Sequence, residues 1–98
     1  MTRFLTMWKM NPDMVPKDPE ERMKLWLSMM DMIKASLRSG EILDWGEFCD
    51  LSGGYTISEG DDMDHLIGFM RYTPYVIFDA KPVLSADQVI EAIRKAAS

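Results

Sequence analysis

Cysteine and histidine are almost absent from this chain of 98 residues, which contains one of each, Cys49 and His65. A lone cysteine cannot form an internal disulfide, and without a second cysteine no pair with metal-ligand spacing exists. We therefore expect an intracellular protein of the reducing cytoplasm that needs no tightly bound metal or other cofactor.

Positive charge is also scarce, because 11 Lys and Arg residues stand against 16 Asp and Glu residues, for a net charge of −5. This charge repels both the phosphate backbone and anionic lipid surfaces, and no basic stripe with interleaved aromatic residues is present. Long apolar runs are missing too, since Arg3 and Lys9 interrupt the first segment. We expect no nucleic-acid partner, no signal peptide and no membrane helix.

The remaining composition is that of a folded domain, with 47% hydrophobic and 28% charged residues. The length allows one domain over residues 1–98, because a second core would lack material. A chain this short has a modest core, so association with further copies would add stability.

Alternation of apolar and polar residues predicts four strands, and two segments with apolar residues at helical spacing separate them. Asp18, Pro19 and Glu21 form the start signal of the first helix, and Gly40 supplies its stop. Asp61 or Asp62 caps the second helix. The predicted strands are 3–10, 41–50, 55–59 and 75–84; the predicted helices are 18–39, a short helix before Thr73 with Met63, Leu66, Ile67 and Met70 as its apolar face, and a final helix from Ser85.

This order is the split βαβ pattern of a ferredoxin-like α+β fold, βαββαβ, with a four-stranded antiparallel sheet and a C-terminal helix. Both crossover helices then cover one face of the sheet and leave the other open. Strands one and four carry apolar residues on both faces, so something must cover the open face. We expect a homodimer, or a higher oligomer, in which two sheets face each other with a small cavity between or beside them.

Two segments carry a resemblance to a known group of proteins: Gly53-Gly54-Tyr55-Thr56-Ile57-Ser58-Glu59, and Val76-Ile77-Phe78-Asp79-Ala80-Lys81-Pro82-Val83-Leu84. With the acidic helix start between them, the chain resembles the small members of the dimeric α+β barrel superfamily over nearly its whole length. That superfamily includes muconolactone isomerase-like, YCII-like, monooxygenase-like and haem-binding proteins. The resemblance implies the fold and the dimer but no single chemistry. The His and Asp pair of the YCII-like branch has no counterpart here.

Glu47 and Glu59 are the candidate catalytic residues, since each lies on a strand beside apolar neighbours. A carboxyl group buried in a cavity has a raised pKa, which suits it to general acid or base chemistry. The alternative is that both lie at solvated strand ends. Cys49, on the same predicted face as Glu47, is more simply a buried inert thiol than a nucleophile.

Four aromatic residues, Trp8, Trp45, Tyr55 and Tyr75, would line a pocket for an aromatic or lipophilic ligand if they shared the open face of the sheet. The alternative is ordinary core packing. We expect His65 to be exposed, because it lies one step off the apolar stripe of its helix, and the acids around it to cap that helix rather than bind a metal.

The sequence favours a homodimeric small-molecule-binding domain, either a cofactor-independent isomerase-like or monooxygenase-like enzyme for a small aromatic or lipophilic ligand or a plain binder, and leaves open whether it catalyses a reaction. A protein-interaction or assembly module is the alternative, with the face of the first helix formed by Leu25, Met29 and Met32 as its docking surface. Haem binding is a weaker third hypothesis, because His65 is the only imidazole.

Overall fold

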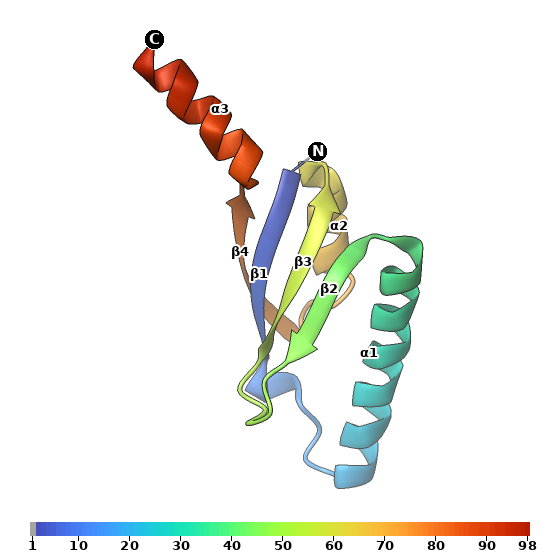
Figure 1. Cartoon of the computed structure of the whole chain (residues 1–98). Helices are drawn as coiled ribbons and strands as arrows, with labels where there is room; N and C mark the ends of the chain where they lie inside the picture. The colour runs from blue at the N-terminus through green and yellow to red at the C-terminus, as the bar shows by residue number, and fades with distance from the viewer. Residues whose placement is uncertain (1) are drawn as a thin grey trace.

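The computed structural model describes residues 2–98, which form a four-stranded antiparallel sheet, two helices packed on it and a third helix that projects from one end (Figure 1). The elements are β1 (Thr2–Met10), a 3₁₀ turn (Pro12–Met14), α1 (Pro19–Ser39), β2 (Ile42–Glu47), β3 (Gly54–Gly60), α2 (Asp62–Met70), β4 (Val76–Val83) and α3 (Ala86–Ala97).

The strand order in the sheet is β2-β3-β1-β4, and every neighbouring pair is antiparallel. Together with the order of helices and strands along the chain, this arrangement confirms the predicted ferredoxin-like α+β fold. β4 is an edge strand, so it has a neighbouring strand on one side only. Proline has no backbone N–H to donate to a ladder, and an edge strand tolerates this at Pro82.

The register separates the side chains of the sheet into two faces. Trp8 pairs with Phe78, and Thr6 pairs with Thr56, on the face that α1 and α2 cover. The neighbouring pairs alternate to the other face, which no element among residues 2–98 covers. That open face carries Leu5, Met7, Ile57, Ile77 and Val83, flanked by charged side chains.

α1 begins and ends as its sequence predicts. The Asp18 carboxylate accepts a hydrogen bond from the Glu21 backbone N–H, and Gly40 ends the helix in a left-handed conformation with φ of 83°. Its buried apolar side chains are Met29 and Ile33, both directed at the sheet. Because Met29 is buried, it does not belong to a free docking face with Leu25 and Met32.

α2 has the predicted N-terminus but presents a different face to the sheet. Asp61 and Asp64 form a reciprocal capping box, so capping accounts for the acids at this point. The prediction that the apolar face of α2 packs on the sheet is wrong. His65 is the buried residue of α2, and Phe69 packs on Phe78 of β4. The four residues predicted to be buried are exposed: Met63, Leu66, Ile67 and Met70.

β2 is shorter than predicted, since it ends at Glu47 rather than Asp50. The chain then makes a six-residue loop before β3, in which Leu51 has a φ of 66°. The loop closes with a backbone hydrogen bond of 2.8 Å from Phe48 N to Gly53 O. Cys49 lies in this loop and is exposed, which corrects the expectation of a buried thiol.

α3 follows β4 after only two residues and extends beyond the end of the sheet (Figure 1). The described chain is therefore elongated, with extents of 60 × 25 × 22 Å. Within residues 2–98, no helix combines the length and the apolar character needed to cross a bilayer.

Two glycines give a matched test of this packing. A Cβ on Gly54 would collide with the Gly46 carbonyl oxygen and the Trp8 indole, whereas a Cβ on Gly68 in α2 meets nothing within 4 Å. We expect Gly54→Ala to destabilise the domain by about 1–3 kcal/mol. Gly68→Ala should stabilise it by about 0.5–1 kcal/mol, because alanine restricts the unfolded chain. Urea unfolding followed by circular dichroism measures both, and equal effects of the two variants would contradict the tight approach of β1 to β3.

Candidate functional site

A cavity of about 430 Å³ separates the sheet from the two helices that cover it. This volume lies in the range of small-molecule pockets. Most of its walls are apolar or aromatic, with all four strands as the floor and α1 and α2 as the sides. The aromatic walls are Trp8, Trp26, Trp45, Phe69, Tyr72 and Phe78.

The indole rings of Trp8 and Trp45 form one end of the cavity. Their centroids are 5.4 Å apart with an interplanar angle of 15°, which is a stacked pair. Trp8 Nε1 donates a hydrogen bond of 3.3 Å to the Tyr55 carbonyl oxygen, so this ring is held in place from the neighbouring strand. The stack gives the site a flat and rigid apolar wall.

Phe78 on β4 is the centre of a second aromatic group. Its ring lies 4.7 Å from that of Phe69 and 6.3 Å from that of Tyr72, centroid to centroid. Phe69 belongs to α2 and Tyr72 follows that helix, so the group joins the end of α2 to the sheet. A ligand in the cavity would therefore touch aromatic rings from two layers of the fold.

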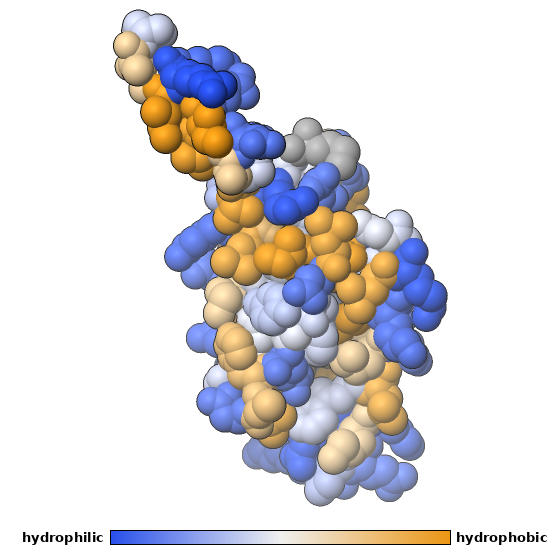
Figure 2. Space-filling model, in the orientation of Figure 1, coloured by the Kyte–Doolittle hydropathy of each residue, from blue (hydrophilic) through white to orange (hydrophobic). Residues whose placement is uncertain are grey.

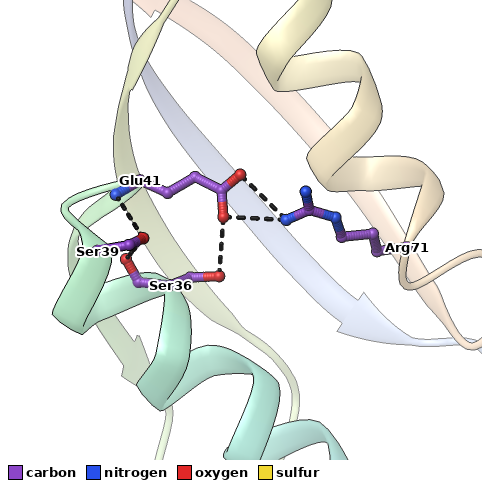
Figure 3. A network of polar contacts seen from close by, with 4 residues as sticks. All are labelled: Ser36, Ser39, Glu41 and Arg71. Carbon is purple, nitrogen blue, oxygen red and sulfur yellow. Dashed lines mark hydrogen bonds and ion pairs between the residues drawn. The ribbon is translucent and has the colours of Figure 1, made fainter.

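A polar cluster borders the cavity where α1 and α2 end (Figure 3). Arg71 NH1 donates to both carboxylate oxygens of Glu41 at 3.0 Å, and Ser36 Oγ donates to Glu41 Oε2 at 3.0 Å. Ser39 Oγ accepts a hydrogen bond from Glu41 N and donates to the Ser36 carbonyl oxygen. Arg71 and Glu41 thus neutralise each other at the edge of an otherwise apolar space.

Tyr72 is the titratable group at the cavity whose environment alters its acidity. Half-burial raises the pKa of its phenol above the ordinary value of 10.0, and the Glu41 carboxylate acts in the same direction. The nearby Arg71 guanidinium opposes this effect, but the burial outweighs it. Tyr72 therefore stays a neutral hydroxyl donor at the edge of the site.

His65 is 7% exposed, which corrects the expectation of a solvated histidine. Nε2 lies 3.0 Å from the Thr2 carbonyl oxygen, which can only accept, so this nitrogen carries a proton. Nδ1 lies 3.1 Å from Ser58 Oγ, and the Phe4 ring packs edge-on at 4.1 Å between centroids. With both nitrogens engaged, His65 fastens α2 to β1 and β3.

The two predicted catalytic carboxylates are not brought together. Glu47 pairs with Gly54 at one end of β3, whereas Glu59 lies five residues further along that strand, about 17 Å away in an extended chain. Glu59 borders the cavity, but Arg3 binds its carboxylate with a shortest N–O distance of 2.9 Å. Glu47 also borders the cavity, and among residues 2–98 its carboxylate has no ion-pair partner.

The four predicted aromatic residues do not share one face. Trp8 and Trp45 line the cavity, whereas Tyr55 lies on the open face, where its hydroxyl donates to Asp44 Oδ2 at 2.8 Å. Tyr75 is exposed in the connection before β4 and is not part of the cavity wall. The pocket therefore lies on the helix-covered side and holds half of the predicted set.

The residues missed from the sequence are those of the polar cluster. Glu41 and Arg71 are 30 positions apart, and each lies within two residues of the end of a helix, where charged residues are common. No spacing rule connects them, because only the packing of α1 and α2 on one sheet face brings them into contact. The Glu41–Arg71 pair therefore had no signal in the sequence.

No protein-family model matches this chain, and no curated protein matches its sequence. Within the described residues 2–98, no three His, Cys, Asp or Glu side chains are grouped as ligands for a metal ion.

The raised pKa of Tyr72 can be tested through the pH dependence of stability. Because its pKa is raised in the folded state, the contribution of Tyr72 to stability is fully present below about pH 10 and is lost as the pH rises beyond that value. We expect Tyr72→Phe, which cannot ionise, to lose less thermal stability than wild type between about pH 9 and pH 11. Tyr75→Phe, outside the cavity, should follow the wild type in these thermal unfolding curves. An unchanged pH profile of Tyr72→Phe would contradict the half-buried site.

Proposed function

We propose that this chain is a small-molecule-binding domain whose ligand occupies the cavity between the sheet and the helices α1 and α2. The observation that carries the proposal is the 430 Å³ space with aromatic walls, in a domain whose buried apolar side chains among residues 2–98 are Met29 and Ile33, at 9% and 8% exposure. Protein interiors are normally filled to close packing. A space of this size on the inner side of the sheet is suited to a bound molecule.

The walls indicate a small aromatic or lipophilic ligand without a negative charge. Arg71 is the cation at the cavity, and Glu41 already occupies it through both carboxylate oxygens. Glu47 adds a carboxylate without an ion-pair partner among the described residues, which disfavours anions further. The Trp8–Trp45 stack offers a flat surface to an aromatic ring.

If the domain is an enzyme, Glu47 is the better of the two candidate acid or base residues. Its carboxylate borders the cavity, whereas that of Glu59 is held by Arg3. Isomerase-like or cofactor-independent monooxygenase-like chemistry would place the substrate against Glu47. Binding without turnover needs only the walls, and the geometry favours it because the other acidic groups at the cavity are engaged in capping or ion pairs.

We further propose that the domain is a homodimer of the dimeric α+β barrel type, working in the cytoplasm. The support is the open face of the sheet, where Met7 and Ile77 are 42% and 43% exposed beside Leu5 and Ile57. A monomer rarely leaves such a contiguous apolar surface to water, and a second copy across a two-fold axis would cover it. The single exposed thiol, Cys49, suits a reducing compartment.

A neutral probe tests the cavity. We expect N-phenyl-1-naphthylamine, whose fluorescence rises in apolar surroundings, to bind the wild type. Ile33→Trp should lower its affinity at least about tenfold by filling the space. Leu27→Trp adds the same ring to an exposed position of α1 and is the matched control. Thermal unfolding establishes that both variants fold; equal probe affinity in the two would contradict the proposed site.

A second experiment tests the charge preference. We expect 2-naphthylmethanol to displace the probe from the wild type more strongly than 2-naphthoate does. Glu41→Gln frees Arg71 for a ligand carboxylate, so 2-naphthoate should gain about tenfold in affinity, the scale of one charge-assisted hydrogen bond. Glu20→Gln removes the same charge from an exposed pair with Lys24 on α1. If both variants bind 2-naphthoate alike, the Glu41–Arg71 pair does not select the ligand.

A further inference from the structure

α3 is a well-formed helix without a packing partner among the described residues 2–98. Ser85 and Gln88 form a reciprocal capping box at its start, so the helix has its own local stabilisation. Its apolar side chains lie on one side (Figure 2), and Val89, Ile90 and Ile93 are 44%, 45% and 62% exposed. Every residue of α3 is exposed. A short amphipathic helix gains most of its stability from packing its apolar face, which nothing in this chain provides.

The overall dimensions show that the chain exposes more surface than a compact monomer of the same size. The solvent-accessible area is 7183 Å², whereas a compact monomer of this mass exposes about 5,700 Å². The radius of gyration is 16.2 Å, against about 12.6 Å for a compact chain of this length. The excess of about 1,500 Å² exceeds the roughly 800 Å² that one partner contributes to a stable interface. The surface left open is therefore large enough for a second copy.

α2 carries an apolar face that matches that of α3. Met63, Leu66, Ile67 and Met70 lie on the side of α2 turned away from the sheet and are 70%, 59%, 44% and 64% exposed. They span about two turns of helix, and the apolar residues Val89, Ile90 and Ile93 of α3 span a little more than one. Each helix thus presents a stripe of the kind that packs against another helix.

The charges of the two helices favour an antiparallel contact. Asp61, Asp62 and Asp64 lie at the start of α2, while Arg94 and Lys95 lie in the last turn of α3. In the antiparallel orientation these opposite charges are neighbours, and the dipoles of the two helices also oppose each other. The parallel orientation would instead place Asp87, at the start of α3, against the acids of α2.

We propose that α3 is an exchange arm that packs antiparallel against the exposed face of α2 in a second copy of this chain, with the exchange made reciprocally. Only Leu84 and Ser85 separate β4 from α3, and α3 points away from the sheet (Figure 1). It therefore does not lie alongside α2 of the same chain. Because donor and acceptor faces occur in one chain, a two-fold pair satisfies both. The contact lies on the helix side of the domain, separate from the open sheet face and from the ligand cavity.

Thiol crosslinking between mixed chains tests the contact directly. In a Cys49→Ser background, one chain carries Ile67→Cys on α2 and the other carries Ile93→Cys on α3. After equilibration and treatment with a short bismaleimide, we expect a covalent dimer with one chain of each kind, identified by its mass. The control chain carries Ile77→Cys on the open sheet face and should give no product with Ile93→Cys.

Three results would overturn the proposal: no product between positions 67 and 93, a product between positions 77 and 93 instead, or crosslinking within one chain when both cysteines are on it.

An independent measurement is the mass of the protein in solution. Ile93→Glu should weaken the association at least tenfold by light scattering, whereas Glu91→Ala, opposite the apolar side of the same helix, should not. Equal association of these two variants would also refute the arm. Probe binding in the cavity should be the same in both, which separates this test from that of ligand binding.

Discussion

The pairing of β1 with both β3 and β4 is the interaction on which the rest of the structure depends. This register sends Trp8 and Phe78 to one face of the sheet and Met7 and Ile77 to the other. The chain has two helices for the first face and none for the second. The domain is therefore asymmetric, with an inner face that encloses a cavity and an outer face that stays open to water.

The cavity follows from how the two helices rest on the inner face. α1 touches the sheet mainly through Met29 and Ile33, and α2 is fastened through His65 and Phe69. Between these contacts the layers stay apart, and aromatic rings line the space rather than fill it. A ligand that enters would add the packing that the core lacks and would stabilise the folded state in proportion to its concentration.

The three apolar surfaces left outside have a common physical basis. The open sheet face, the outer side of α2 and the apolar side of α3 each carry side chains that a small monomer cannot bury, because its surface is large relative to its volume. The sheet face is flat and suits another sheet, whereas the two helical faces are narrow stripes that suit each other. The Glu41–Arg71 pair lies between α1 and α2 and is independent of these surfaces.

The sequence predicted the elements well wherever the signal was local. The cap at Asp18, the left-handed Gly40, the start of α3 after Ser85 and the alternation of β4 all occur as expected, because each depends on residues within a few positions of one another. The four aromatic residues expected on the open face are divided instead, because Trp8 and Trp45 line the cavity under the helices while Tyr55 lies on the opposite face. The period of a strand shows which residues share a face, but not which faces of two strands coincide.

The sequence by itself thus determined the order and type of the helices and strands and the class of fold. Tertiary structure alone decided the direction of α2, whose apolar stripe points outward while His65 points in. Helical periodicity reveals that a stripe exists but not what covers it, and here the hydrogen bonds that join His65 to Thr2 and to Ser58 orient the helix. The cavity and its polar edge likewise arise only when distant segments meet, since Glu41 and Arg71 become neighbours through the packing of two helices on one sheet.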